Sequence, residues 1–390
     1  MMRICIVTSS RADYGLLKPL IQRLHDDTDV ELTIIATGMH LCAEFGNTYL
    51  EIENDGYTIF KKIDIQISSD TPSAMTKTMG IAMICFSDLL SSHTPDLLIV
   101  LGDRYEIMAV CCAAVNQRIP IAHVHGGEIT QGVVDEYYRH SITKMSNLHF
   151  TCCEEYRKRV IQLGENPGFV FNVGSLCIEN VLNTQLLSLD ILEKKLGTTL
   201  CNKPYAVVTF HPVTLENNNG TEQIMELMSA MDSHNDLKFI VTKSNSDAGG
   251  REINRLWDEY AGRRENCQIV ASLGMQLYLT ALKHASMIIG NSSSGIIEGP
   301  ASGIPTINIG NRQKGRIMAD SIINCLPTAQ DIDASIYKAM TPDFVRLAKS
   351  AQNPYGNGST SCSVVEIIKD FLSGDITVLK EFYDIKFEMH

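Results

Sequence analysis

The sequence has too little positive charge to favour a nucleic-acid partner. Its 390 residues include 33 Lys and Arg against 45 Asp and Glu, which gives a net charge of −12. Proteins that bind nucleic acids neutralise phosphates with a basic surface, and this composition does not supply one overall. A local positive site for one small phosphorylated molecule remains compatible with the acidic total.

Metal and disulfide motifs are missing, although cysteine is plentiful. The 12 cysteines include the vicinal pairs Cys111–Cys112 and Cys152–Cys153, and no two are spaced as C-x-x-C. Neighbouring cysteines do not readily bridge, so this usage indicates reduced thiols rather than a disulfide framework or a zinc site. We expect a cytoplasmic protein that requires no metal and no organic cofactor.

Long apolar runs and a dinucleotide fingerprint are absent as well. The run at 4–7 is followed at once by polar residues, so it is too short for a secretory signal and is typical of a first strand. No stretch approaches the length of a membrane span, so we expect no membrane partner. The loop at 8–15 is not G-x-G-x-x-G, which disfavours an NAD-dependent oxidoreductase.

What the chain does contain is a repeated alternation of short apolar runs and longer helical patterns. This alternation predicts α/β architecture with parallel sheets covered by helices. It restarts after Ser175. The expected strands are 4–7, 32–36, 97–101, 121–124, 206–210, 238–242, 269–271, 287–289 and 306–309.

The length favours two domains, because a chain of 390 residues exceeds the size at which one core usually keeps growing. We place the first domain at 1–175, the second at 176–365 and a tail at 366–390 that packs back on the first domain. Ligands of such sheets bind beyond the carboxyl ends of the strands, so the residues that follow the strands are the candidates for function.

Two strand ends in the first half carry charged side chains. The loop at 8–15 brings Arg11 to a helix start, where backbone N–H groups and a guanidinium can bind phosphate. Asp103 and Arg104 follow a strongly apolar strand in the same way. Each arrangement could equally be a helix cap beside a solvated arginine. The phosphate-binding and the capping interpretations both stay open.

The segment H-V-H-G-G-E at 123–128 gives a third group of candidates. The H-x-H spacing of His123 and His125 suggests a metal site, because alternate residues of a strand point the same way. No third ligand has convincing spacing, however, so we disfavour a metal. We favour an acid/base cluster of His125, Glu128 and Asp135, with the glycines allowing close approach of a ligand. Capping roles for the two carboxylates remain the alternative.

The second half carries groups that suit an anionic ligand. The strongest is G-N-S-S-S-G at 290–295, where three hydroxyls and free N–H groups at a helix start form a diphosphate cradle. Glu298 can accept from a ribose diol, and Arg312 lies in a concentrated positive loop. His211 and Asn245 each follow a strand. The alternatives are a serine cap and a solvated charged loop.

Together these segments resemble the hydrolysing UDP-N-acetylglucosamine 2-epimerases of bacterial sialic acid biosynthesis, along nearly the whole chain. The order and spacing of the segments carry the resemblance. They are S-R-A-D-Y-G ending at Gly15, T-G-M-H at 37–40, G-D-R-Y-E at 102–106, H-V-H-G-G-E at 123–128, D-E-Y-Y-R-H-S-I-T-K at 135–144, Gly174-Ser175, H-P at 211–212, G-N-S-S-S-G at 290–295 and N-R-Q-K-G-R at 311–316.

The resemblance implies a GT-B-like fold of two Rossmann-like domains facing a central cleft, with the nucleotide held mainly by the second domain. It implies UDP elimination to a 2-acetamidoglucal and then hydration, giving N-acetylmannosamine and UDP. The implied acid/base residues are Asp103, His125, Glu128 and Asp135, with His211 near the phosphates or sugar. The implied binding residues are Arg11, Gly15, His40, Arg104, Asn245, Ser292, Ser293, Glu298 and Arg312.

One departure affects the proton transfers. Some relatives carry E-G-G-E where this chain has His125 before the two glycines and Glu128. An imidazole can do the task of the missing carboxylate at neutral pH, or Glu128 can take it over.

The alternatives are the same reaction on UDP-N,N'-diacetylbacillosamine, on the way to legionaminic acid, and a GT-B glycosyltransferase. The resemblance also suggests a homodimer or homotetramer.

Overall fold

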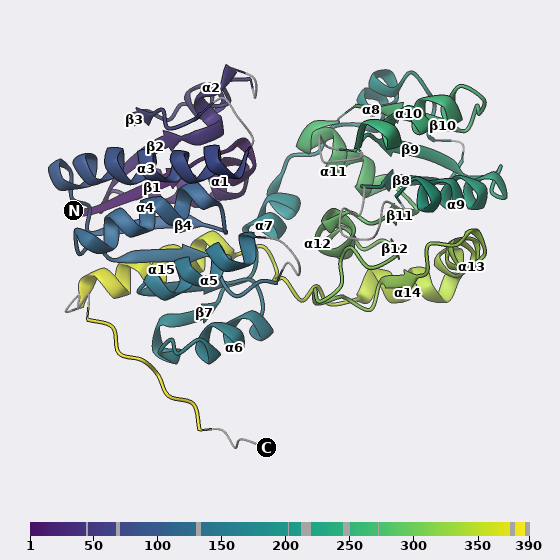
Figure 1. Cartoon of the computed structure of the whole chain (residues 1–390). Helices are drawn as coiled ribbons and strands as arrows, with labels where there is room; N and C mark the ends of the chain where they lie inside the picture. The colour runs from purple at the N-terminus through teal and green to yellow at the C-terminus, as the bar shows by residue number, and fades with distance from the viewer. Residues whose placement is uncertain are drawn as a thin grey trace. The chain divides into compact units, whose positions relative to one another are not determined.

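The chain forms two compact units in the computed structural model (Figure 1). The first unit contains Met1–Asn180 and Tyr355–His390, and the second contains Val181–Pro354. The structure describes residues 1–43, 46–67, 71–129, 134–201, 203–211, 220–244, 250–271, 273–374 and 379–386. Within these ranges, no helix combines the length and apolar character that crossing a bilayer requires.

The first unit is built on a parallel sheet in the order β3-β2-β1-β4-β5-β6-β7. Its central strands are apolar and buried on both faces, as parallel strands covered by helices must be. The strands are β1 (Met2–Thr8), β2 (Val30–Thr37), β3 (Ile59–Ile63), β4 (Leu97–Leu101), β5 (Ile121–Val124), β6 (Leu148–Thr151) and β7 (Val170–Asn172).

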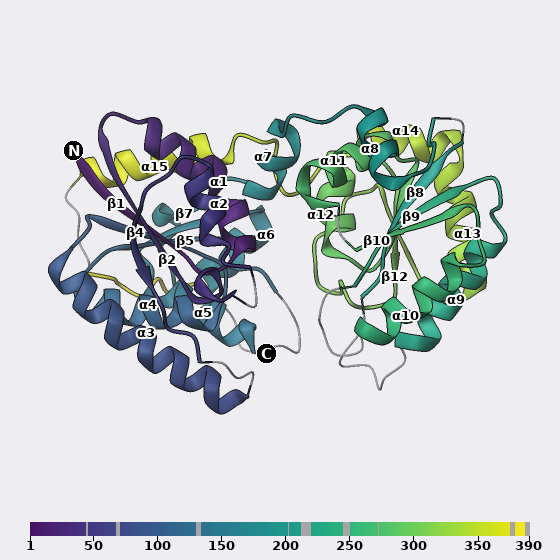
Figure 2. The same cartoon turned by 90° about the horizontal axis from the view of Figure 1, so that it is seen from above.

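Helices cover both faces of this sheet, with α1 and α15 on one face and α3 and α4 on the other (Figure 2). Short 3-10 turns, η1 (Gly38–Leu41) and η3 (Pro167–Phe169), lie in the connections. The helices are α1 (Arg11–Asp26), α2 (Tyr49–Asn54), α3 (Pro72–Ser92), α4 (Tyr105–Asn116), α5 (Asp135–Met145), α6 (Glu154–Gln162), α7 (Leu176–Asn183) and α15 (Thr360–Ser373).

The second unit repeats the plan with a parallel sheet in the order β10-β9-β8-β11-β12-β13. Its strands are β8 (Tyr205–Thr209), β9 (Lys238–Thr242), β10 (Cys267–Val270), β11 (Met287–Gly290), β12 (Thr306–Ile309) and β13 (Ile322–Cys325). Its helices are α8 (Leu189–Leu196), α9 (Gly220–Asp232), α10 (Gly250–Ala261), α11 (Gly274–His284), α12 (Ser293–Ala301), α13 (Ala329–Met340) and α14 (Pro342–Ser350). The predicted α/β class with two Rossmann-like domains is confirmed.

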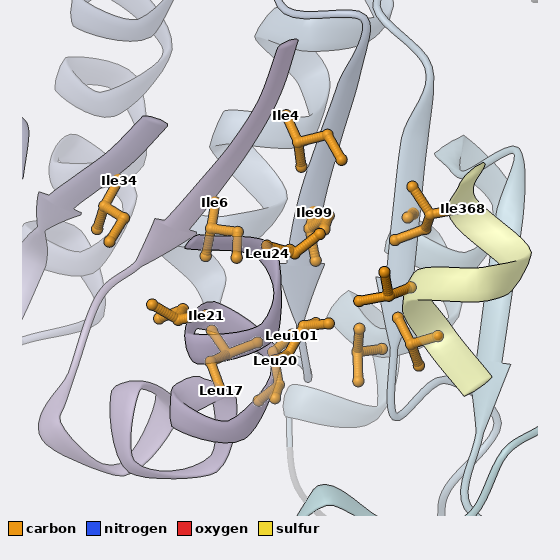
Figure 3. Packing of buried hydrophobic residues seen from close by; sticks show 14 of the residues in the cluster. Ile4, Ile6, Leu17, Leu20, Ile21, Leu24, Ile34, Ile99, Leu101 and Ile368 are labelled. Carbon is orange, nitrogen blue, oxygen red and sulfur yellow. The ribbon is translucent and has the colours of Figure 1, made fainter. Parts of the chain in front are cut away.

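The last helix, α15, packs into the core of the first unit, although it follows the whole second unit in the sequence. Ile368 of α15 is fully buried in the cluster that contains Ile4, Ile99 and Leu20 of α1 (Figure 3). Burying a side chain of this size stabilises the fold by roughly 1.5–3 kcal/mol. The structure therefore differs from the predicted boundaries: the chain returns to the first unit at Tyr355 rather than after 365, and leaves it after Asn180 rather than 175.

The segment after α15 also lies against the first unit. Lys380 Nζ donates to the backbone oxygens of Thr143, Lys144 and Ser146 at the end of α5 and pairs with Glu165 at 2.6 Å. Lysine at a helix C-terminus satisfies carbonyls that have no partner within the helix. Lys380 thus ties the tail to the helix that begins at Asp135.

Candidate functional site

The candidate residues of the first unit gather because β1, β4 and β5 are neighbours in the sheet. Parallel neighbours end at the same edge, so the residues after Thr8, Leu101 and Val124 share that edge. Position after a strand, which can be read from the sequence, therefore predicts that these residues lie at one edge of the sheet. How the side chains are held there was not visible in the sequence.

Arg139 lies at the centre of the acid/base candidates and was not among the predicted site residues. It is buried and pairs with Asp103, and its Nη1 donates to Glu136 Oε2 at 2.7 Å and to the backbone oxygen of Glu128 at 3.1 Å. The signal that could have found it is its place in α5, one helical turn after Asp135. Arg139 is therefore a buried cation that is held by two partly exposed carboxylates.

Asp135 starts α5, and its carboxylate is repelled by the negative charge of Asp103. Loss of solvation by the surrounding protein and then the negative charge of Asp103 raise the pKa of Asp135 above its ordinary value, although solvent still reaches the side chain. A carboxyl group whose pKa is raised binds a proton more readily than an ordinary one, as an acid/base role requires. Asp103 and Asp135, two of the four acid/base residues that the resemblance implies, are therefore electrostatically coupled.

The two histidines of H-V-H-G-G-E have different partners, and only His123 lies in the strand. His123 lies in β5, and its ring nitrogens bond to the backbone oxygen of Gly102 at 2.7 Å and to Thr143 Oγ1 at 3.1 Å. Burial lowers the pKa of His123 to about 3. His125 lies beyond the strand in the left-handed region, with φ of 65°.

His125 is placed beside Glu128 by this unusual backbone. Its Nδ1 lies 3.7 Å from Glu128 Oε1, and the thiol of Cys152 donates to the same oxygen at 3.3 Å. Gly127 makes the turn possible, because a Cβ there would lie 2.5 Å from the backbone oxygen of Tyr156. Burial and then the Glu128 charge raise the pKa of Cys152 well above its ordinary value.

Arg104 is held by carboxylates of its own unit. Its Nε donates to Glu106 Oε1 at 2.5 Å, and its positive charge opposes the burial that raises the pKa of Asp13. Asp13 accepts from Ser9 Oγ at 2.7 Å. Arg11 is exposed at the start of α1. Of the two arginines predicted at strand ends of the first unit, Arg11 is thus exposed and Arg104 is compensated internally.

Gly15 and His40 were predicted to contact the substrate, and the structure uses both internally. The Gly15 carbonyl accepts from Asn180 Nδ2 at 2.8 Å. His40 is fully buried, with Nε2 3.0 Å from Thr8 Oγ1 and Nδ1 2.8 Å from Thr48 Oγ1. Burial lowers the pKa of His40 to about 4. The resemblance implies a binding residue at this position, and the structure places His40 inside the fold as a neutral residue bonded to two threonines.

In the second unit, Asn291 fixes the loop that carries His211. Its Oδ1 accepts from the His211 backbone N–H, and its Nδ2 donates to the His211 oxygen, both at 2.8 Å. Gly290 is needed before it, because a Cβ there would lie 1.9 Å from the backbone oxygen of Thr209. His211 Nδ1 lies 3.1 Å from Ser244 Oγ. Asn245, the predicted nucleotide contact, is outside the described residues.

The three serines at the start of α12 have different tasks. Ser292 is the N-cap, and its side chain accepts from the Ser294 N–H at 3.4 Å. Ser294 donates to Glu298 and lies 2.5 Å from the hydroxyl of Tyr278. Ser293 opens the helix. Ser294 and Tyr278 therefore orient the carboxylate that was predicted to hold the ribose, which the sequence did not reveal.

Arg312 brings positive charge to the same strand end. Its Nη1 donates to the Asn291 oxygen at 3.1 Å, and Gln313 Nε2 donates to that oxygen at 2.8 Å. The helix start at Ser293 adds N–H groups and the positive end of the helix dipole. This edge of the second unit thus combines a guanidinium, a serine cap and a helix start, which are groups of the kind that can bind an anion.

Comparisons with known proteins agree with one another. The chain matches the protein family described as UDP-N-acetylglucosamine 2-epimerase over residues 22–369. It is 42% identical to the polysialic acid biosynthesis protein P7 of Escherichia coli, covering 99% of this chain and 98% of that protein. It is 41% identical to the GDP/UDP-N,N'-diacetylbacillosamine 2-epimerase (hydrolyzing) of Campylobacter jejuni, covering 88% of each.

A solved structure shares the fold. The UDP-GlcNAc 2-epimerase of Neisseria meningitidis bound to UDP-GlcNAc superposes with a TM-score of 0.77 at 15% identity, covering 95% of this chain and all of that one. At this identity the similarity establishes the GT-B-like architecture and nothing finer.

Proposed function

Because this chain belongs to the UDP-N-acetylglucosamine 2-epimerase family, we propose that it is a hydrolysing 2-epimerase that converts UDP-N-acetylglucosamine and water into N-acetylmannosamine and UDP. The observation that carries the proposal is the pairing of Arg139 with Asp103 beside Asp135, whose pKa is raised. A relative named as a hydrolysing 2-epimerase at 41% identity supports the hydrolytic outcome.

The first step is elimination. A base removes the proton at C2 while the C1–O bond to UDP breaks, and the electron pair of that bond leaves with the UDP oxygen as a C1–C2 double bond forms. Asp103 and Asp135 are the proposed acid/base groups, and Glu128 with His125 is the second pair. A raised pKa supports Asp135 as a group that holds a proton in one step and releases it in the other.

The leaving group needs its charge neutralised. We assign this task to Arg312, Ser292, Ser293 and the N–H groups at the start of α12, with Glu298 on the ribose. Arg11 and Arg104 are proposed to add positive charge from the first unit, and His211 to contact the phosphates or the sugar. Water then adds to C1, and a proton returns to C2 from the opposite face to give the manno configuration.

A second candidate substrate is UDP-N,N'-diacetylbacillosamine, because two relatives are named for this sugar nucleotide, at 41% and 33% identity. The reaction would be the same, with different groups at C4 and C6 of the ring. A glycosyltransferase of the same architecture would instead require a sugar acceptor. Cytoplasmic location and a homo-oligomeric state stay predictions from the sequence.

Product analysis by proton NMR tests the proposal. The purified chain is incubated with each UDP-sugar alone, and the configuration of the released sugar is read from its coupling constants. We expect UDP and a free manno sugar from one of the two substrates. Release of a gluco sugar would mean simple hydrolysis, and no release from either donor would favour the transferase.

A further inference from the structure

A soft-metal donor set lies at the end of β5, and the proposed reaction does not use it as a set. His125, Glu128 and Cys152 each offer one donor atom, and these atoms all lie within 4.8 Å of one another. An imidazole, a carboxylate and a thiol are the ligands that Zn²⁺ takes in proteins. The H-x-H spacing in the sequence pointed to a different pair, which the orientation of His123 rules out.

The spacing of the donor atoms suits tetrahedral coordination. Ligands at the usual Zn–N, Zn–O and Zn–S distances are separated by roughly 3.3–3.8 Å at the corners of a tetrahedron. The Glu128 Oε1 to Cys152 Sγ distance is 3.3 Å, and the His125 Nδ1 to Glu128 Oε1 distance is 3.7 Å. The donor atoms of the remaining pair, His125 and Cys152, lie within 4.8 Å of each other and need to close by at most roughly 1.5 Å, a side-chain adjustment.

The fold presents these donors in a partly enclosed place. The Cys152 side chain is buried, whereas 20% of the Glu128 side chain and 11% of the His125 side chain are exposed, so an ion reaches the set past the carboxylate. Nearby guanidinium groups have partners outside the three donor atoms: Arg139 binds Asp103, Glu136 and the backbone oxygen of Glu128, and Arg159 binds the Gly127 oxygen.

We propose that His125, Glu128 and Cys152 form a binding site for one thiophilic divalent cation of the Zn²⁺ type. Binding replaces the S–H bond of Cys152 by a sulfur–metal bond and releases the thiol proton to solvent, with no change in oxidation state. The cation's charge stabilises the buried thiolate. Water fills the fourth position.

The site has a functional consequence that rests on the proposed function. A cation on Glu128 occupies the carboxylate that we assign to proton transfer, so Zn²⁺ inhibits turnover. The inhibition constant then equals the dissociation constant of Zn²⁺ for this site. If Zn²⁺ binds through Cys152 without inhibiting, the cation site stands and the assigned role of Glu128 is overturned.

Cobalt spectroscopy on the full chain tests the site without using activity. Co²⁺ bound to a thiolate gives a sulfur-to-metal charge-transfer band, and tetrahedral Co²⁺ gives intense visible bands. We expect both bands to saturate at one Co²⁺ per chain and to disappear on adding Zn²⁺. The absence of a charge-transfer band in the reduced protein would overturn the proposal.

Substitutions identify the ligands. Cys152→Ser should abolish the charge-transfer band, whereas Cys153→Ser, a change at the neighbouring N-cap of α6, and Cys201→Ser, at an exposed thiol, should retain it. A band that persists in Cys152→Ser would overturn the site. His125→Asn suits the left-handed backbone and should weaken Co²⁺ binding at least as much as the ~10–100-fold that loss of an outer-shell partner costs. Unchanged affinity in His125→Asn would remove the imidazole from the set and contradict the proposal.

Discussion

The two units share one sheet plan but present different chemistry at their strand ends. In the first unit, titratable groups are packed against one another, with Arg139 between Asp103 and Glu136 and with His125 beside Glu128. In the second unit, the corresponding edge carries neutral groups together with the guanidinium of Arg312: Asn291 bonds to the His211 backbone, and Ser292 caps α12. The same architecture thus couples charged side chains at the strand ends of one unit and gathers hydrogen-bond donors at the strand ends of the other.

This comparison yields predictions in which changes in the first unit alter turnover and changes in the second alter UDP affinity. The largest effect is expected for Asp103→Asn and Asp135→Asn. Each should lower kcat by about 10²–10⁴-fold, because an amide cannot exchange a proton in the transition state. UDP binding measured by isothermal titration should stay unchanged. Turnover equal to that of the wild type would remove the residue from the acid/base set.

Arg139→Lys should have the next largest effect. Lysine keeps the charge but cannot hold Asp103, Glu136 and the Glu128 carbonyl together, so we expect kcat to fall by on the order of 100-fold with little change in KM. Arg157→Lys, a change in the same unit at a guanidinium that contacts Glu154 and the Val170 carbonyl, is the matched control. An equal loss in both variants would mean a general effect on the fold.

Acid should destabilise the first unit through Glu165. Burial alone would raise the pKa of this carboxyl group, but hydrogen bonds from His149, Lys144 and Lys380 outweigh burial and lower it to about 2. The ordinary value is 4.5, so the stabilisation is complete above that pH and is lost as the pH falls towards 2. It amounts to about 3 kcal/mol.

Hydrogen exchange of peptides from β6 and β7 at several pH values measures this loss. Protection should fall between about pH 4.5 and 2, the window between the two pKa values. Glu165→Gln should be less stable at neutral pH and should show a shallower pH dependence. The same slope in both proteins would exclude Glu165 as the source of acid sensitivity.

The smallest of these effects is expected in the second unit. Arg312→Ala should weaken UDP binding by about 10-fold, as loss of one charge-assisted hydrogen bond does, and should leave kcat at saturating substrate nearly unchanged. Lys314→Ala is the matched control, since it removes an equal charge from an exposed position of the same loop. An unaltered dissociation constant in Arg312→Ala would remove this side chain from the diphosphate site.

The sequence was informative where function depends on position along the chain. Strand ends follow from apolar periodicity, so Asp103, Glu128 and Ser292 could be named without coordinates. It was uninformative where contacts join distant segments. Cys152, which follows β6, hydrogen-bonds to Glu128, which follows β5. The His40 ring nitrogens bond to the hydroxyls of Thr8 and Thr48.

Backbone conformation was the other limit. His125 takes a left-handed conformation that a strand pattern does not predict for a residue with a side chain, and its imidazole lies beside Glu128. The return of the chain at Tyr355 also depends on packing, because helical periodicity alone does not say which sheet α15 will cover.

The most direct test of the account is whether solvent hydrogen enters at C2. The reaction is run in D₂O with the preferred UDP-sugar, and the released sugar is examined by proton NMR and mass spectrometry. Proton transfer by the first unit predicts a manno sugar with one deuterium at C2, because the returning proton comes from a group in exchange with solvent. A released sugar that keeps its original C2 hydrogen would contradict the account.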